Sequence, residues 1–231
     1  MKAADVRAVL AAGARIARDA AIVPQLVAST GLSRENVELG LARHLETRAS
    51  DAEIAALLAA AGHATSVGVV LSASVFVAPL RAIALAFAAS DRVVVKPSRR
   101  EPVFATALVA ELADPRVTLG DPLAGSDAAA RARVARVDVY GRDETIASVR
   151  RAAGPGVEVR GHGAGIGVAL VGGDASTFAG AAEALAEDVT AFDQRGCLSP
   201  RVAFVVGDAD ALARALFAAL ESRGALVPRG A

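Results

Sequence analysis

The single cysteine of the chain, Cys197, lies in a stretch that differs from the usual surroundings of a packing residue. In FDQRGCLSPR, Gly196 and Ser199 indicate a turn, and Arg195 brings a positive charge close to the thiol. Such a charge and the backbone amides of a turn favour the thiolate, which is the nucleophilic form of cysteine. The alternative is a small buried residue in front of a strand. The turn residues favour a reactive thiol that forms a covalent intermediate.

A lysine at the end of an expected strand is the second candidate for chemistry. In VVVKPSRREP, Lys96 follows three valines and precedes a Pro-Ser pair. A lysine at this place can reach a phosphate or a ribose hydroxyl of a nucleotide that lies across the end of the sheet. The alternative is a solvated lysine that ends an edge strand, and the spacing does not decide between the two.

Two glycine-containing stretches are further candidates. VDVYGRDETIASVR predicts a strand, a turn at Gly141 and a helix whose N-terminus favours a pyrophosphate. It lacks a GxGxxG pattern and has two acids at the start of the helix, so a plain turn is the alternative. GHGAGIG contains His162, which is either a titratable group in an active-site loop or a solvated residue where only glycine fits a close crossing.

The composition limits the classes of function. Twenty-five basic and 25 acidic residues give a formal net charge of zero, which does not indicate a nucleic-acid surface. One cysteine excludes an intrachain disulfide, and the scattered His44, His63 and His162 do not indicate a metal site. The charged N-terminal residues and the broken apolar run at 63–80 predict neither a signal peptide nor a membrane span. We therefore expect a soluble cytoplasmic protein.

The candidate residues must be positioned by an α/β fold. Residues 1–62 are predicted to be helical, with Ser33 and Ser50 as N-caps and Gly62 as a stop. After them, short β-branched runs alternate with helical patterns, which predicts a parallel sheet with helices on both faces. The turns at the strand ends are then the natural ligand-binding edge. We expect strands at 65–72, 91–98, 134–140, 157–161, 167–172 and 201–207, helices between them and at 208–224, and a polar connection at 119–133.

Four segments in this order resemble the aldehyde dehydrogenase superfamily, and most closely its bioluminescence-type fatty acyl-CoA reductase branch. They are GVVLSASVF, VVVKPS, VYGRDETI and FDQRGCLSPRVAFV. The resemblance covers about residues 64–206. It implies a helical segment at 1–63, a Rossmann-like cofactor domain at 64–192, and at 193–231 the start of a catalytic domain that this chain does not complete.

The resemblance also implies roles for individual residues. Lys96 and Ser98 would hold the adenosine ribose, while Gly141 and the following helix start, at Thr145, would lie near the pyrophosphate. The thiolate of Cys197 would attack the thioester of an acyl-CoA and expel CoA. The acyl-enzyme would then accept hydride from a reduced nicotinamide and release an aldehyde, or the reaction would run in reverse as aldehyde oxidation.

Three positions depart from the family pattern. Ser74 stands at or next to the usual oxyanion-stabilising asparagine, and loss of such a donor costs about 10²–10³ in rate. The glycine loop has no general-base glutamate, which suits a reductase and makes His162 the only nearby acid–base candidate. Arg99 and Arg100 replace the usual acid after KPS and can pair with a 2′-phosphate, so we expect NADPH, with NADH as the alternative.

These departures keep a second class of function open. A truncated or degenerate relative would bind a nucleotide or a partner chain without catalysis. A plain Rossmann-type binding module with an incidental cysteine is a third reading. The expected partners are an acyl-CoA or aldehyde substrate, together with a homo-oligomer or a partner chain that completes the catalytic domain and covers exposed apolar surface.

Overall fold

The chain forms two compact units, each with its own sheet. In the computed structural model, the first unit holds the residues up to Thr30 and Leu41–Ala164, and the second holds Gly31–Gly40 and the residues from Gly165 on. The structure describes residues 2–124, 134–173 and 175–230. The expected polar connection at 119–133 therefore lies outside the described residues from 125 on.

A five-stranded parallel sheet forms the centre of the first unit. Its spatial order is β3-β2-β1-β4-β5. The chain runs outward in one direction from β1 to β3 and in the other direction from β4 to β5. This reversal between β1 and β4 is the place where open α/β sheets bind ligands, outside the carboxyl ends of the strands. The strands are β1 (Val67–Val70), β2 (Val93–Lys96), β3 (Val117–Leu119), β4 (Arg136–Tyr140) and β5 (Glu158–His162).

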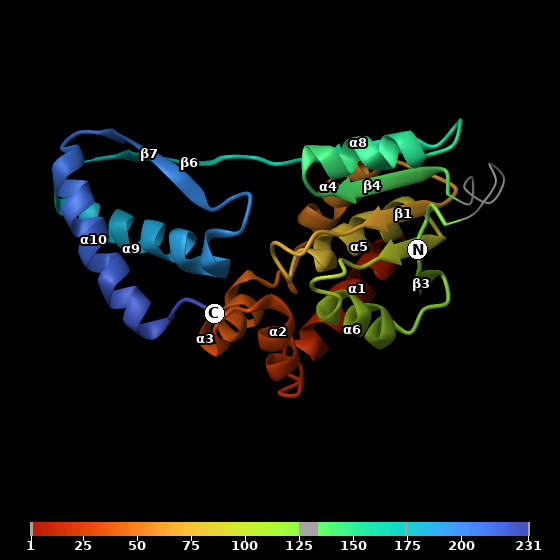
Figure 1. Ribbon diagram of the computed structural model, residues 1–231, viewed down its shortest axis with the longest axis horizontal. Helices are drawn as coiled ribbons and strands as arrows, with labels where there is room; N and C mark the ends of the chain where they lie inside the picture. Colours follow the sequence, from red (N-terminus) through yellow and green to blue (C-terminus); the bar gives the residue numbers. More distant parts are fainter. Residues whose placement is uncertain (1, 125–133, 174, 231) are drawn as a thin grey trace. The chain divides into compact units, whose positions relative to one another are not determined.

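Helices cover both faces of this sheet, as predicted (Figure 1). α8 (Asp143–Ala152) lies on one side, and α5 (Pro79–Ala89) and α6 (Val103–Leu112) lie on the other. The N-terminal helices pack on α5 and α6, which confirms the predicted helical start. They are α1 (Lys2–Ile16), α2 (Ile22–Thr30) and α4 (Asp51–Ala61). Between α2 and α4 the chain forms α3 (Arg34–Leu39), which belongs to the second unit, and the π-helix η1 (Gly40–His44).

The predicted helix signals act as expected. The Ser50 hydroxyl accepts a hydrogen bond from the Glu53 amide while the Glu53 carboxylate accepts from the Ser50 amide, which is a complete capping box at the start of α4. Gly62 ends this helix with a φ of +66°, a conformation that favours glycine. The Ser33 hydroxyl caps α3 by accepting from the amide of Asn36.

The second unit contains a two-stranded parallel sheet covered by helices. β6 (Gly167–Gly172) pairs with β7 (Pro200–Val206), and α9 (Ala175–Thr190) and α10 (Ala209–Leu226) pack against each other. α9 continues into the 3₁₀ helix η2 (Ala191–Gln194). The small core is formed by Phe178, Ala182, Ala186, Leu212 and Ala219.

Two features differ from the sequence prediction. β3 was not expected, because its three residues are too few to show an alternating pattern, although they pair in register with Val93–Val95 of β2. The compact units separate at Gly165, not at the predicted domain limit of 192/193. β7 thus shares a sheet and a core with β6 and α9, and the two-domain division at 64–192 and 193–231 stays a prediction. In the described part of the chain, no helix is long and apolar enough to cross a membrane.

We expect Gly68→Ala to destabilise the first unit. Gly68 lies in the centre of β1, where a Cβ atom would stand 2.4 Å from Cβ and 2.9 Å from Cγ of Pro122. The residues of β1 are all buried, so the neighbours have little room to move. Overpacking of this kind costs about 1–3 kcal/mol of unfolding free energy, measurable by urea titration. Gly120→Ala is the control, since its Cβ would meet Val94 at an ordinary 3.5 Å; equal stability losses in the two variants would contradict the packing of β1.

Candidate functional site

Four predicted site residues lie at the carboxyl ends of the strands in the first unit. Ser74 is exposed in the loop after β1, Lys96 is the last residue of β2, Gly141 follows β4, and His162 ends β5. Because all the strands are parallel, these ends meet at one edge of the sheet, which we call the carboxyl edge. The topology thus brings together residues that are up to 88 positions apart in the chain.

Lys96 is held in an ion pair at this edge. Its Nζ lies 2.5 Å from Oδ2 of Asp121, which follows β3. Burial acts to raise the pKa of Asp121, but the hydrogen bonds from Lys96 and from the amide of Leu123 outweigh it and leave the pKa below its usual value. The carboxylate is therefore ionised at neutral pH. β2 lies between β1 and β3, so the alternative of a lysine that ends an edge strand is wrong.

The other predicted ribose-binding residues follow β2 directly. The Ser98 hydroxyl accepts a hydrogen bond of 3.3 Å from the amide of Arg100. The side chain of Arg99 is exposed. Two arginines and a lysine thus lie within five residues of the chain, and Asp121 pairs with Lys96 and is also affected by the charge of Arg99.

The turn after β4 is closed by backbone and ring contacts with β5. The amide of Gly141 donates to the carbonyl of His162 at 3.2 Å. The rings of Tyr140 and His162 stack with centroids 4.4 Å apart and an interplanar angle of 8°. The amide of Thr145 donates to the carbonyl of Arg142 at 2.9 Å inside the first turn of α8. The backbone amide of Thr145 is therefore already paired, and its side-chain hydroxyl is the group that this residue can offer to a ligand.

A buried polar row on β4 leads toward this turn. Arg136, Asp138 and Tyr140 alternate along the strand and so share one face. Arg136 is 2% exposed; it donates to the carbonyl of Ala61 at 2.9 Å and to the Asp138 carboxylate at 3.1 Å. Burial raises the pKa of Asp138, although the charge of Arg136 opposes the shift. Burial, together with the negative charge of Asp138, raises the pKa of Tyr140 to about 12.

Cys197 belongs to the second unit, where it is free and exposed. The alternative of a buried packing residue is therefore wrong. Residues 195–199, which we call the cysteine turn, are closed by two hydrogen bonds. The Ser199 amide donates to the Gly196 carbonyl at 3.2 Å, and the Gln194 side-chain amide donates to the Pro200 carbonyl at 3.2 Å.

The end of the glycine-rich stretch packs closely against the cysteine turn. A Cβ atom at Gly167 would lie 2.3 Å from the carbonyl oxygen of Ser199, and one at Gly165 would lie 3.8 Å from the carbonyl oxygen of Cys197. Only glycine fits at Gly167, which agrees with the close-crossing interpretation of this part of GHGAGIG. His162 lies instead at the exposed end of β5 in the first unit.

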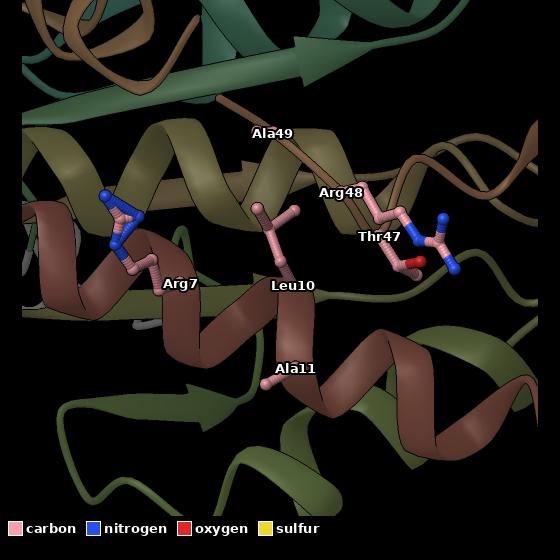
Figure 2. A pocket seen from close by; sticks show the side chains of 6 residues that line it. All are labelled: Arg7, Leu10, Ala11, Thr47, Arg48 and Ala49. Atoms are coloured by element: carbon pink, nitrogen blue, oxygen red, sulfur yellow. The ribbon is translucent and has the colours of Figure 1, made fainter. Parts of the chain in front are cut away.

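A shallow depression lies in another part of the first unit (Figure 2). None of the predicted site residues lines it. Figure 2 shows its side chains on α1 and on the segment that precedes α4: Arg7, Leu10, Ala11, Thr47, Arg48 and Ala49. Arg7 forms an ion pair with Asp51, so its charge is already matched.

Comparison with protein families identifies the chain. The family described as acyl-CoA reductase (LuxC) matches residues 16–231. The chain belongs to the LuxC acyl-CoA reductase family. This agrees with the resemblance drawn from the four sequence segments. A comparison with curated protein sequences gives no match.

Solved aldehyde dehydrogenases have the same fold as this LuxC-family chain. A benzaldehyde dehydrogenase from Corynebacterium glutamicum is 19% identical, with a TM-score of 0.66 over 95% of this chain and 54% of its own. Lactaldehyde dehydrogenase from Escherichia coli is 16% identical, with a TM-score of 0.65 over 96% of this chain and 50% of its own. A propionaldehyde dehydrogenase from Clostridium phytofermentans is 15% identical, with a TM-score of 0.63 over 95% of this chain and 54% of its own. The predicted aldehyde dehydrogenase-like α/β fold is confirmed, and the chain spans about half the length of these structures.

Several residues around the predicted site are not predicted as site residues by the sequence. Asp121 falls in a predicted polar connection, and the pairing of β2 with β3 brings it to Lys96 from 25 residues away. Arg136 and Asp138 fall in a predicted strand, although two charges at alternate positions in VARVDVY are a signal of a buried ion pair. Asn36 falls in a predicted helix.

The titration of Tyr140 tests this geometry, because it is the only tyrosine of the chain. We expect tyrosinate absorbance to appear near pH 12 in place of the usual value of about 10. Since the folded-state pKa is the higher one, the unfolding free energy falls as pH rises from about 10 toward 12. His162→Ala exposes the Tyr140 ring and should lower the midpoint of the tyrosine titration. His162→Phe keeps an aromatic ring stacked on Tyr140 and should preserve that midpoint. An ordinary midpoint in the unchanged, folded chain would contradict the burial of Tyr140.

Proposed function

We propose that this LuxC-family chain reduces an acyl-CoA thioester to an aldehyde with NAD(P)H, through an acyl-enzyme on Cys197. One observation carries the proposal: the single cysteine of an acyl-CoA reductase family member is exposed on a turn that two hydrogen bonds close. Exposure and a defined backbone are what a nucleophilic thiol requires. A thiol kept only for packing needs neither.

The carboxyl edge of the first unit fits a dinucleotide. The strand order reverses between β1 and β4, which is the place where open α/β sheets bind dinucleotides, and Lys96 and Ser98 stand at the neighbouring strand end. We propose that these two side chains hold the adenosine ribose. Gly141 and the Thr145 hydroxyl would lie near the pyrophosphate, where the acids Asp143 and Glu144 in the first turn of α8 weaken anion binding.

The residues of the chain divide the reaction between them. The Cys197 thiolate would form a bond to the acyl carbon, the bond from that carbon to the CoA sulfur would break, and CoA would leave with the electron pair. The Ser74 hydroxyl would donate to the developing oxyanion, and His162 would supply the proton that the departing CoA sulfur takes up. When bound, a reduced nicotinamide would supply the hydride that converts the acyl group to an aldehyde, and the bond from the acyl carbon to the Cys197 sulfur would break to restore the thiolate. The stretch RGHGAGIG has no carboxylate to activate water, which disfavours hydrolysis of the acyl-enzyme.

The proposal includes a partner that covers an apolar face of the second unit. The outer face of the β6–β7 sheet exposes five apolar side chains, among them the register partners Leu170 and Phe204, which are 82% and 60% exposed. An apolar face of this kind marks an interaction surface. We therefore propose that a partner chain covers this face, with a second copy of the chain as the competing occupant. The free thiol fits a reducing cytoplasm.

A second function remains a candidate because of Ser74. A serine hydroxyl is shorter than the asparagine side chain that usually serves the oxyanion. A chain that holds a nucleotide at the carboxyl edge without turnover would act as a binding subunit. Such a chain would bind NAD(P)H but would not consume it.

Cys197→Ala should abolish turnover while leaving cofactor binding intact. Loss of a covalent nucleophile reduces the rate by about three orders of magnitude or more. The assay follows the absorbance of the reduced nicotinamide with an acyl-CoA as substrate, and cofactor fluorescence measures binding separately. Cys197→Ser is the matched control, because it keeps the size and the turn but not the thiol. Turnover that persists in both variants would refute the acyl-enzyme, and binding without turnover in the unchanged chain would favour the binding subunit.

Arg99→Glu should shift the cofactor preference from NADPH toward NADH. The exposed guanidinium can pair with a 2′-phosphate, whereas a carboxylate repels it and accepts from a ribose hydroxyl. The ratio of the dissociation constants for NADPH and NADH should change by about tenfold, as expected for one charged contact. Arg214→Glu, at an exposed position on α10 of the second unit, is the control for a general change of charge. An unaltered ratio in Arg99→Glu would show that this residue does not select the cofactor.

A further inference from the structure

A buried asparagine far away in the sequence holds the segment in front of the cysteine turn. Asn36 lies in α3 of the second unit and is 1% exposed. Its Oδ1 accepts from the Phe192 amide at 3.0 Å, and its Nδ2 lies 3.2 Å from both the Thr190 carbonyl oxygen and Oδ1 of Asp193. One side chain therefore serves a donor and two acceptors at the end of α9, from 154 to 157 positions away in the chain.

The segment that Asn36 holds has an unfavourable backbone conformation. Phe192, Asp193 and Gln194 have φ values of 54°, 52° and 60°, which non-glycine residues rarely adopt. Three such residues in succession persist only where the surroundings determine their conformation. Two of the hydrogen bonds of Asn36 are to backbone groups at this kink, the Phe192 amide and the Thr190 carbonyl.

Asp193 extends the contact on its other side. Its side chain is 6% exposed. Oδ1 faces Asn36, while Oδ2 accepts from the amide of Gly230 at 3.2 Å and lies 3.4 Å from a guanidinium nitrogen of Arg195. Donors from three separate segments therefore converge on one carboxylate. Arg195 is the first residue of the cysteine turn, so this contact reaches the turn itself.

A continuous set of contacts thus leads from α3 to Cys197. Asn36 and Asp193 fix the backbone of Phe192 to Gln194, and the Gln194 side chain then ties the far end of the cysteine turn at Pro200. The Ser33 hydroxyl accepts from the Asn36 amide and so fixes the start of α3, on which this asparagine stands. A change in the backbone angles of one residue at this kink would therefore shift the whole cysteine turn.

We propose that Asn36 and Asp193 form a pair of positioning residues that fix the direction and exposure of the Cys197 thiol. This inference rests on the proposed role of Cys197 as the nucleophile. The pair touches neither substrate nor thiol; it acts through the backbone of residues 192–194. A purely structural role, in which Asn36 only docks α3, predicts loss of stability without a specific effect on the thiol.

The experiment measures alkylation of the only cysteine of the chain by iodoacetamide near neutral pH, followed by intact mass. The rate in the folded chain is compared with the rate in the same chain unfolded in urea. Asn36→Asp places two carboxylates face to face and removes the donor to Thr190. Asp193→Asn is the milder variant, because both backbone contacts of Asn36 are kept. In the double variant Asn36→Asp/Asp193→Asn the two side chains exchange roles: the new amide at position 193 can donate to the new carboxylate at position 36.

Leu212→Ala is the matched control. This leucine is buried in the core between α9 and α10 of the same unit and lies outside the contacts that lead to the cysteine turn. It should lower the stability of the unit without changing the alkylation rate of the folded chain. Thermal unfolding of each variant identifies the temperature at which all of them are folded.

We expect the folded chain to react faster than the unfolded chain and Asn36→Asp to lose about tenfold of that rate, the equivalent of one hydrogen bond to a charged group. The double variant should recover most of the loss, and Leu212→Ala should lose none. An activated thiol whose rate is the same in Asn36→Asp would overturn the positioning role and leave the proposed function intact. A folded chain that reacts no faster than the unfolded one would overturn both. A loss of rate in Leu212→Ala equal to that in Asn36→Asp would reduce the pair to a structural role.

Discussion

The parallel pairing of β1 with β2 on one side and β4 on the other is the constraint on which the first unit depends. All four residues of β1 are buried, and both sides of its backbone are hydrogen-bonded to neighbouring strands. The connection through α5 carries the chain to one side, and the later strands β4 and β5 extend the sheet on the other. The carboxyl edge with Ser74, Lys96, Gly141 and His162 is a consequence of this topology and does not need a direct contact among these side chains.

The sequence was most informative where local chemistry decides the structure. The run VGVV is buried on both faces of the parallel sheet, and in the run VVV only Val94 is half-buried, so the β-branched composition of both runs identifies them as strands. The cap residues Ser33, Ser50 and Gly62 were recognised because a cap depends on neighbours within four residues. The turn that carries Cys197 is predicted for the same reason, since Gly196 and Ser199 stand beside the cysteine.

The sequence was least informative where residues distant in the chain meet. Asp121 reaches Lys96 only because Val95 and Leu119 are in register, and no spacing in the sequence shows a register. Residues 31–40 belong to the unit of the cysteine, although more than 120 residues separate them from Gly165. Asn36 in a short helix carries no local sign of this role. Its role in the fold follows from its hydrogen bonds with three backbone and side-chain groups at the end of α9.

The ion pair between Lys96 and Asp121 bears on how a nucleotide would be held. A lysine ammonium has three donors, and Asp121 occupies one of them in the structure. Two donors remain for ribose hydroxyls, so a ribose can bind without displacing the carboxylate. The charge of Arg99 lowers the pKa of Asp121. In the proposed binding mode, a 2′-phosphate would be attracted by Arg99 and repelled by Asp121. The proposed preference between the two nicotinamide cofactors would then depend on the balance of two opposite charges, and the pairing of β3 with β2 brings one of them, Asp121, to this edge.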